Sequence, residues 1–309
     1  MAKKDQVVVL GSLNYDMIFR QQRMPEIGET YTADSLQTAS GGKGANQAVQ
    51  CARLGIPVYL AGAVGRDASG SWLLEQLQGY GVHTEYVGLL EECTGVGMVN
   101  CLQDGSVRAT IYGGANARVS REAVEALRPL LADSRILILQ LEIPVDTVAC
   151  AVAAGRESDC YVILNAAPAR SLAAEVLAGV DCLVVNETEA SFYWGQPVAD
   201  FASAELAARE LITRVRDTVI ITLGGQGSLV CRHNGRQRIP ACRVKAVETT
   251  GAGDSYIGAY AAALLRGQDA FAAARFAAAA AAITVQGVGA QPSMPSREDI
   301  DGFLAGAGK

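Results

Sequence analysis

Short runs of consecutive apolar residues recur along the chain, each about as long as one β-strand. A strand that is apolar on both faces is typical of a parallel sheet, because the crossover helices cover both sides of such a sheet. The runs comprise residues 7–10, 58–63, 136–140, 161–165, 182–185 and 219–222.

Longer segments with apolar residues at helical spacing lie between these runs. Alternation of buried strands and amphipathic helices predicts an α/β fold with a mostly parallel sheet between helices. Ligands of such folds bind outside the carboxyl ends of the strands. The predicted helices comprise residues 44–54, 71–80, 121–131, 145–155 and 202–214.

One segment interrupts the alternation. Residues 96–102 and 107–112 are two strand-like runs, and the segment 103–106 between them contains the turn signal Asp104-Gly105. This pattern predicts a β-hairpin. A hairpin inserted into an α/β frame has little core of its own to bury, so it is a candidate lid or dimer contact. An ordinary surface hairpin is the alternative.

Composition excludes several classes of function. The 309 residues carry a formal charge of −6, and no basic cluster favours a nucleic-acid partner. The eight cysteines form no C-x-x-C pair, so we expect reduced thiols and no zinc site. The Ala-rich stretch 272–282 is too short to span a bilayer, and no leader precedes the first strand. We therefore expect a soluble, cytoplasmic protein with no membrane partner.

The segment 249–254, Thr-Thr-Gly-Ala-Gly-Asp, leads into the apolar run 256–265. This run predicts a helix, whose N-terminus suits a phosphate because its amide donors are unpaired. Asp254 lies at the mouth of this anion site, where a carboxylate can accept a proton from an attacking hydroxyl. The alternative is a tight turn with Asp254 as a helix cap.

Two N-terminal segments suit a polyol. Asn14 and Asp16 follow the first strand and point the same way in an extended chain, where they can bind adjacent hydroxyls. A strand-end turn is the alternative. The segment 40–46, Ser-Gly-Gly-Lys-Gly-Ala-Asn, lacks P-loop spacing, which leaves a close approach of backbone to ligand with Lys43 and Asn46 directed at it.

Polar residues also follow three later strands. Glu142 ends one strand, and 186–189, Asn-Glu-Thr-Glu, ends another. Carboxylates and amides at strand ends can hold water around Mg²⁺, although Asn186 and Glu189 also have capping spacing. The glycines of 222–227, Thr-Leu-Gly-Gly-Gln-Gly, allow close approach of a nucleotide.

Together these motifs resemble the ribokinase family of carbohydrate kinases, within the pfkB group. The most specific are 41–47, Gly-Gly-Lys-Gly-Ala-Asn-Gln, and 251–254, Gly-Ala-Gly-Asp, and 289–293 follows the same pattern. The resemblance spans Val7 to about Phe303. It implies a three-layer αβα domain over residues 1–309, with a small β-sheet lid at about 15–35 and 94–113 that also forms a homodimer interface.

The resemblance also implies roles for individual residues. Asp254 would be the catalytic base, and the amides of Gly251, Ala252 and Gly253 would stabilise the transferring phosphoryl group. ATP and Mg²⁺ would be required. The implied sugar ligands are Asn14, Asp16, Gly41, Gly42, Lys43, Asn46, Met98, Ile111 and Glu142. The implied nucleotide-site residues are Asn186, Glu189, Thr222, Gly224, Gly225, Gly227 and Ala278.

Two positions depart from the family pattern. The loop for an activating monovalent cation such as K⁺ would comprise Glu248, Thr250, Thr284, Gly287, Gly289 and Ser293. Glu248 replaces the usual Asp, and this predicts weaker K⁺ activation. Ala278 replaces a polar residue near the adenine, which predicts weaker or broader nucleotide preference.

The sequence therefore predicts ATP-dependent phosphorylation of the primary hydroxyl of a small furanose, with D-ribose as the leading substrate. Other substrates stay open, namely 2-deoxyribose, a ketohexose or a nucleoside. A catalytically silent sugar-binding sensor is the alternative from another class of protein. The intact 251–254 motif favours the enzyme.

Overall fold

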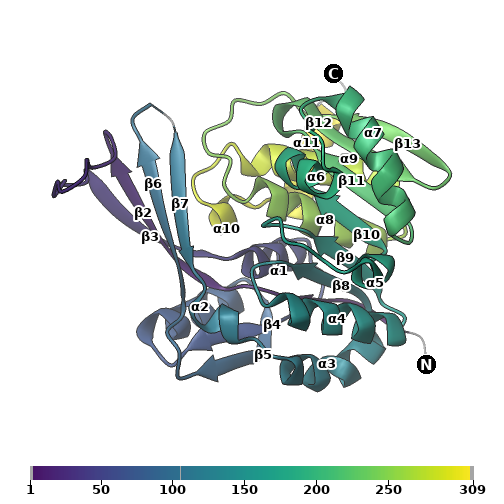
Figure 1. Cartoon of the computed structure of the whole chain (residues 1–309), viewed down its shortest axis with the longest axis horizontal. Coiled ribbons are helices and arrows are strands. Elements are labelled where there is room, and N and C mark those ends of the chain that lie inside the picture. Colours follow the sequence, from purple (N-terminus) through teal and green to yellow (C-terminus); the bar gives the residue numbers. More distant parts are fainter. Residues whose placement is uncertain (1–2, 105, 307–309) are drawn as a thin grey trace.

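The central sheet has nine strands in the order β13-β12-β11-β10-β9-β8-β1-β4-β5. The computed structural model describes residues 3–104 and 106–306. Neighbouring strands are parallel from β5 to β11, and β12 and β13 are added antiparallel at one edge (Figure 1). The strands are β1 (Lys4–Leu10), β4 (Val58–Gly65), β5 (His83–Leu90), β8 (Ser134–Gln140), β9 (Tyr161–Asn165), β10 (Cys182–Val185), β11 (Thr218–Thr222), β12 (Gly227–Arg232) and β13 (Gly235–Pro240).

Both faces of this sheet are covered, which explains the continuous apolar runs. Val7 and Val9 point into one core, while Val8 and Leu10 point into the other. One face carries α1 (Lys43–Arg53), α2 (Ala68–Gly79), α8 (Ala252–Leu265), α9 (Ala270–Thr284) and α11 (Arg297–Gly306). The other carries α3 (Arg121–Asp133), α4 (Val145–Glu157), α5 (Ala174–Ala178), α6 (Glu187–Trp194) and α7 (Phe201–Leu211).

Short helical segments complete the chain. They are η1 (Gly114–Arg118), η2 (Ile212–Arg214), η3 (Gly224–Gln226) and α10 (Ala290–Ser293). The three-layer α/β architecture is the predicted one. None of the helices in the described ranges combines the length and apolar character that a membrane crossing requires.

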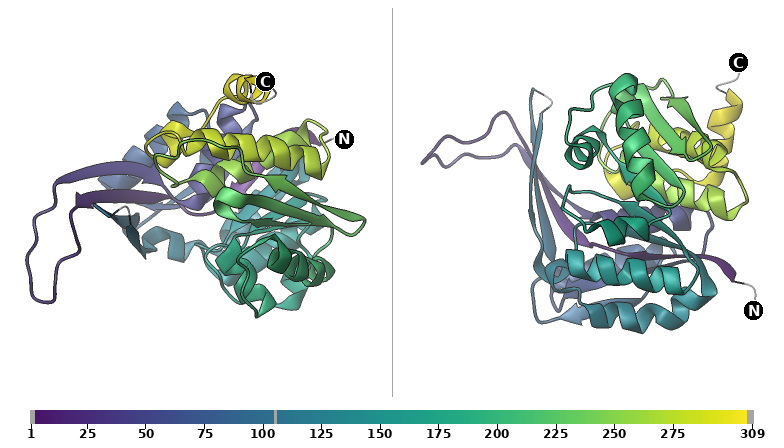
Figure 2. Two further views of the ribbon diagram at one scale, coloured as in Figure 1. Left: turned by 90° about the horizontal axis from the view of Figure 1, so that it is seen from above. Right: turned by 45° about the vertical axis from the view of Figure 1, so that its right-hand side comes forward.

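A second, four-stranded sheet projects from the body, as Figure 2 shows from above. We call it the lid; its order is β3-β2-β6-β7, formed by β2 (Asn14–Gln21), β3 (Ser35–Gly41), β6 (Gly95–Leu102) and β7 (Val107–Tyr112). The antiparallel β6–β7 pair confirms the predicted hairpin, although its turn residue Gly105 lies outside the described residues. The lid extends past the expected boundary at residue 35, because β3 continues to Gly41.

Candidate active site

Asp254 joins the two glycine-rich motifs. Its Oδ2 accepts a hydrogen bond from Asn46 Nδ2 at 2.9 Å, and its Oδ1 accepts one from Gln47 Nε2 at 2.9 Å. Asp254 is buried in the first turn of α8, whereas Asn46 and Gln47 lie in the first turns of α1. Residues 208 positions apart thus meet beyond the carboxyl ends of β1 and β8, as the sequence predicted for this fold.

Close packing of α1 against α8 explains this meeting. A Cβ atom on Gly258 would lie 2.8 Å from the Gln47 carbonyl oxygen, so only glycine lets the two helices approach this closely. Gly251 precedes α8 with φ of 79°, a left-handed conformation that favours glycine and turns the chain into the helix. The predicted anion site is therefore the N-terminus of a 14-residue helix, with Gly253 exposed at its mouth.

Asp16 faces this centre from the lid. Gly41 and Gly97 flank it, and a Cβ atom on either residue would lie within 1.9–2.2 Å of the Asp16 carboxylate oxygens. Asp16 Oδ1 is buried without a hydrogen-bond partner among the described residues. Burial, together with the charges of Glu142 and Asp254, raises the pKa of Asp16 to about 7. A buried carboxylate with unused acceptor capacity suits a ligand that brings hydroxyl donors.

Glu142 and Lys43 add opposite charges to the surroundings of Asp254. Glu142 Oε2 accepts hydrogen bonds from Ser12 Oγ at 2.5 Å and from the Lys43 backbone N–H at 3.2 Å. Burial opposes the charge on the Lys43 amine, but Asp254, Glu142 and Glu189 together raise its pKa. Burial also raises the pKa of Asp254, while Lys43, Asn46 and Gln47 act in the opposite direction. The cluster therefore holds one cation among several carboxylates.

Asn116 in η1 is a site residue that sequence reasoning missed. Its Nδ2 donates to Asn14 Oδ1 at 2.8 Å and to the Leu13 carbonyl at 2.9 Å, and its Oδ1 accepts from the Leu13 N–H. Asn116 therefore fixes the chain that carries Asn14. Ser12, which orients Glu142, was missed as well. Asn116 belongs to no motif and lies about 100 positions from its partners, so no local signal identifies it. Ser12 lies two residues before Asn14 after the first strand, but its bond to Glu142 spans 130 positions.

The lid register separates the two predicted apolar contacts. Asp16 pairs with Gly97, and Gly97 pairs with Ile111, so these three residues share the inner face of the lid. Met98 pairs with Met17 and lies on the outer face. Adjacent strand residues point to opposite faces, so Met98 cannot contact a sugar held by Asp16. The expectation for Met98 is corrected on this ground, while Ile111 is correctly oriented.

The predicted nucleotide residues gather beyond β10 and β11. Asn186 and Glu189 form a capping box: Glu189 N–H donates to Asn186 Oδ1 at 3.0 Å, and Asn186 N–H donates to Glu189 Oε2 at 2.8 Å. Thr222 Oγ1 is 3.5 Å from the Val185 carbonyl, and Gly224 and Gly225 are exposed beside it. Ala278 is half-buried on α9. Capping and ligand contact are compatible here, since each Glu189 oxygen can accept a further donor.

Gly227 has a structural role at this site. Its φ is 114°, and a Cβ atom would lie 2.1 Å from the Ile239 carbonyl oxygen. The residue therefore lets η3 turn into β12 against β13, which accounts for this glycine without a nucleotide.

Four of the predicted cation-loop residues lie together. Glu248 Oε2 accepts the Gly289 N–H at 3.1 Å, and Ser293 Oγ, beside Gly287, donates to the Val288 carbonyl at 3.0 Å. Thr284 is buried and its hydroxyl bonds Ser255 Oγ at 2.8 Å, while Thr250 is exposed between Glu248 and α8. Within residues 3–104 and 106–306, no group of three or more His, Cys, Asp and Glu residues is placed to hold a metal ion.

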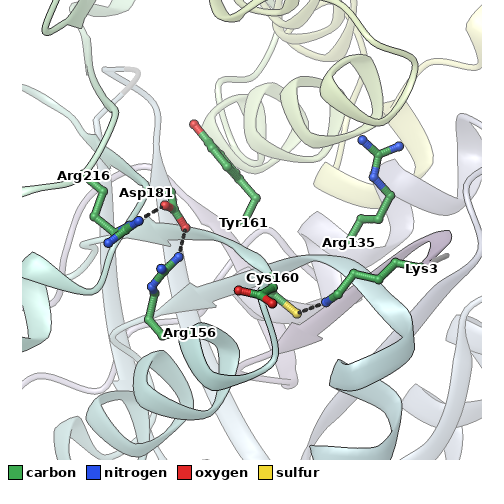
Figure 3. Close-up of a pocket in the computed structure, with 8 residues that line it drawn as sticks. Lys3, Arg135, Arg156, Cys160, Tyr161, Asp181 and Arg216 are labelled. Carbon is green, nitrogen blue, oxygen red and sulfur yellow. Dashed lines mark hydrogen bonds and ion pairs between the residues drawn. The ribbon is translucent and has the colours of Figure 1, made fainter. Parts of the chain in front are cut away.

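A separate cavity of about 670 Å³ opens at the amino ends of the strands, the opposite edge of the sheet (Figure 3). Its cations have protein partners: Asp181 pairs with Arg216 at 3.0 Å and Arg156 at 3.5 Å, and Asp5 pairs with Arg135 at 2.7 Å. Lys3 Nζ donates to the Ser134 carbonyl at 2.7 Å. We therefore assign no ligand to this cavity.

Comparisons with known proteins agree with this geometry. The model of the pfkB family carbohydrate kinases matches residues 4–297. A ribokinase of Schizosaccharomyces pombe is 39% identical over 307 residues, covering 96% of each chain. A deoxyribokinase of Salmonella typhi is 35% identical, covering 97% of this chain and 98% of the relative. The solved structure of Arabidopsis thaliana ribokinase complexed with ribose and ATP superimposes with a TM-score of 0.89 at 35% identity, covering 98% of this chain and 99% of that one.

Proposed function

Because the chain belongs to the pfkB family of carbohydrate kinases, we propose that it transfers the γ-phosphoryl group of ATP to the primary hydroxyl of D-ribose. The products are ribose 5-phosphate and ADP. The observation that carries the proposal is the buried Asp254, which both glycine-rich motifs hold at the amino end of α8.

The sugar lies between the lid and α1. Asp16, Asn14 and Glu142 accept or exchange hydrogen bonds with its hydroxyls, with Lys43 and Asn46 beside them. Gly41 at the end of β3 leaves room for the Asp16 carboxylate, and Gly42, with φ of 90°, turns the chain into α1 beside the sugar. Ile111 supplies an apolar contact from the inner face of the lid. This polar lining favours a small sugar rich in hydroxyl groups.

Asp254 takes the proton from the O5 hydroxyl as O5 forms its bond to the γ-phosphorus. The bond between the γ-phosphorus and the β–γ bridging oxygen breaks, and ADP leaves with that electron pair. Amide groups of Gly251, Ala252 and Gly253 at the N-terminus of α8 stabilise the charge on the transferring group. Lys43 on α1 adds positive charge on the sugar side, while α8 supplies both the base and the amides that stabilise the transferring group.

Asn186, Thr222, Gly224, Gly225 and Ala278 line the nucleotide site in this proposal. Mg²⁺ fits this site as a hydrated ion held mainly by the ATP phosphates, because Mg²⁺ retains several waters and uses few protein ligands. Glu189 would order those waters in this proposal. When bound, Mg²⁺ neutralises part of the phosphate charge.

A second candidate substrate is 2-deoxyribose. The Salmonella typhi relative named deoxyribokinase is 35% identical over nearly the whole chain, close to the identity of the ribokinases. The two sugars differ by one hydroxyl, and a site that hydrogen-bonds this hydroxyl rejects the analogue that lacks it.

ADP release with Mg-ATP tests the proposal, using D-ribose, 2-deoxyribose, fructose and adenosine, each with and without K⁺. Ribose should give the highest kcat/KM, and phosphorus NMR should place the new phosphate on O5. Higher kcat/KM with 2-deoxyribose would move the assignment to the second candidate. Sugar binding without ADP release under all these conditions would support a silent sensor instead.

Asp254→Asn tests the base. Removal of a general base costs on the order of 10²–10⁴ in rate, so kcat should fall by this factor while ribose still binds. Asp301→Asn, an exposed change on α11, is the control. Turnover of Asp254→Asn within a few-fold of the parent protein would remove Asp254 from the mechanism.

Homodimerisation and a cytoplasmic location also remain proposals. Exposed apolar side chains on the outer face of the lid support a dimer, as argued below. A cytoplasmic location is supported by the use of ATP as a co-substrate.

A further inference from the structure

Asp254 is held by two amide side chains, each of which accepts a hydrogen bond from a further amide. Gln47 donates through Nε2 to Asp254 Oδ1 at 2.9 Å and to Asn165 Oδ1 at 3.2 Å. Gln47 Oε1 accepts from Gln140 Nε2 at 2.6 Å. Gln140 ends β8 and is fully buried, as is Gln47. The Gln47 amide therefore has a defined partner on each side.

Asn46 has the same arrangement on the other carboxylate oxygen. Its Nδ2 donates to Asp254 Oδ2 at 2.9 Å, and its Oδ1 accepts from Gln291 Nε2 at 3.0 Å. Gln291 lies on α10 and is buried. Gln140 and Gln291 thus contact different inner amides from different elements, and neither hydrogen-bonds Asp254 itself.

A rotated inner amide would be unfavourable in this arrangement. Rotation of Gln47 would bring Oε1 against the Asp254 carboxylate and Asn165 Oδ1, and would place two NH₂ groups face to face at Gln140. The first two contacts would bring one acceptor against another with no hydrogen atom between them, and the third would bring one donor against another. A mispaired buried polar group is costly. Without Gln140, Gln47 would lose the donor that distinguishes its two orientations on that side.

We propose that Gln140 and Gln291 are positioning residues, which hold the amides of Gln47 and Asn46 with both NH₂ groups directed at Asp254. Gly11 leaves room for the Gln140 side chain, since a Cβ atom at this position would lie 1.8 Å from Gln140 Oε1. The role rests on the proposed function of Asp254 as the base.

The arrangement acts on the proton affinity of the base. Hydrogen bonds from NH₂ groups favour the ionised carboxylate, and they oppose the burial that raises the pKa of Asp254. Other charged groups face Asp254 from the surrounding elements: Lys43 from α1, Glu142 after β8, and Asp16 from the lid. Loss of a positioned NH₂ group raises the pKa further, so the base becomes active only at higher pH.

The test compares Gln140→Met with Gln50→Met. Methionine is close to glutamine in length but donates no hydrogen bond. Gln50 is the matched control, because it is a fully buried glutamine on the same helix as Gln47, bonded to Ser255 Oγ and the Pro295 carbonyl and not to Asp254, Asn46 or Gln47. Single-turnover rate constants are measured from pH 5 to 9 at saturating ribose, so that titration of Asp16 does not limit sugar binding.

In Gln140→Met the acidic limb of the pH–rate profile, where the rate falls as the base becomes protonated, should move up by about one pH unit. Loss of a hydrogen bond to a charged group changes its pKa by about this amount. The rate should approach that of the parent protein at high pH, with KM for ribose within about two-fold. Gln50→Met should keep the parent limb. An unshifted limb, or a loss of rate equal at every pH, would overturn the proposal.

Gln291→Met provides the second variant should Gln140→Met fail to fold, as judged by circular dichroism and Tm. It should shift the same limb through Asn46, and an unshifted limb in this variant would equally overturn the role of Gln291. Asp254→Asn separates the two proposals. Normal turnover in that variant ends the role of the base itself, whereas lost turnover with an unshifted Gln140→Met limb ends only the positioning role.

Discussion

Asp16 is a side chain of the candidate site whose charge changes near neutral pH. Its pKa of about 7 arises from burial and from the neighbouring carboxylates Glu142 and Asp254. Asp16 is therefore largely protonated below pH 7 and ionised above it. Only the ionised form accepts hydrogen bonds from two hydroxyls through both oxygens.

We expect KM for ribose to rise as pH falls through 7, because sugar binding requires ionised Asp16. Asp16→Asn should raise KM at all pH values and remove most of this dependence. Asp34→Asn, an exposed change next to β3, is the control and should keep the parent profile. A KM that stays constant from pH 6 to 8 in the parent protein would contradict the assignment.

Glu248 lies in the proposed cation loop, where the resemblance to the family leads us to expect Asp. Its carboxylate reaches the Gly289 N–H at 3.1 Å and so closes the loop on itself. We expect weak activation by K⁺, and stronger activation in Glu248→Asp, whose shorter side chain withdraws from Gly289. The ratio of the rates in K⁺ and in Na⁺ measures this activation for the parent protein and for Glu248→Asp. Glu298→Asp, an exposed change on α11, is the control. Strong K⁺ activation of the parent protein would refute the prediction.

At the scale of elements, the outer face of the lid has an apolar surface. Leu36, Met98 and Tyr112 are 50%, 43% and 55% exposed, and the strand register places all three on this face. Exposed apolar groups that cluster in this way are typical of an interaction surface. We expect two copies of the chain to cover each other's outer faces.

Met98→Glu should therefore shift the protein from dimer to monomer, because the interface would bury an unpaired charge. Analytical ultracentrifugation at several concentrations measures this shift. Leu206→Glu on α7 changes a leucine that is 53% exposed and lies far from the lid, and it should leave the dimer intact. A parent protein that is monomeric at micromolar concentration would exclude the lid interface.

The elements differ in how well sequence predicts them. The six apolar runs form β1, β4 and β8 to β11. Both faces of these strands are covered, so their sequences are continuously apolar and can be recognised as buried strands. β3, Ser-Leu-Gln-Thr-Ala-Ser-Gly, and β13, Gly-Arg-Gln-Arg-Ile-Pro, are mostly exposed and have no such signal. Motif residues such as Asp254 can be proposed from the sequence, whereas Asn116, Gln140 and Gln291 make long-range contacts that spacing does not show. The face of Met98 depends on strand register, which the sequence leaves open.

At the scale of the whole molecule, the proposed catalytic groups and the ion pairs of Asp181 occupy opposite edges of the same sheet. Asp181 at the amino edge accepts the Val162 N–H at 2.8 Å as well as Arg216 and Arg156. Asp181→Ala should lower the free energy of unfolding by about 2 kcal/mol, because it leaves these donors without an acceptor. Urea unfolding measures the loss, while kcat and KM should stay within two-fold. Glu75→Ala, an exposed change on α2, is the control. An Asp181→Ala variant with the stability of the parent protein would refute this role.

The pairing of β2 with β6 has a consequence for folding. These strands are parallel, and Asn14 pairs with Gly95, about 80 positions further along the chain. The lid's two hairpins can therefore join only after the intervening β4, α2 and β5 have brought their ends together. Loop closure of that length is slow, so the sugar ligands on β2 should be among the last groups to acquire their native neighbours. During synthesis, native affinity for ribose would then appear after most of the amides in the central sheet are protected from hydrogen exchange, an order that pulse labelling can measure.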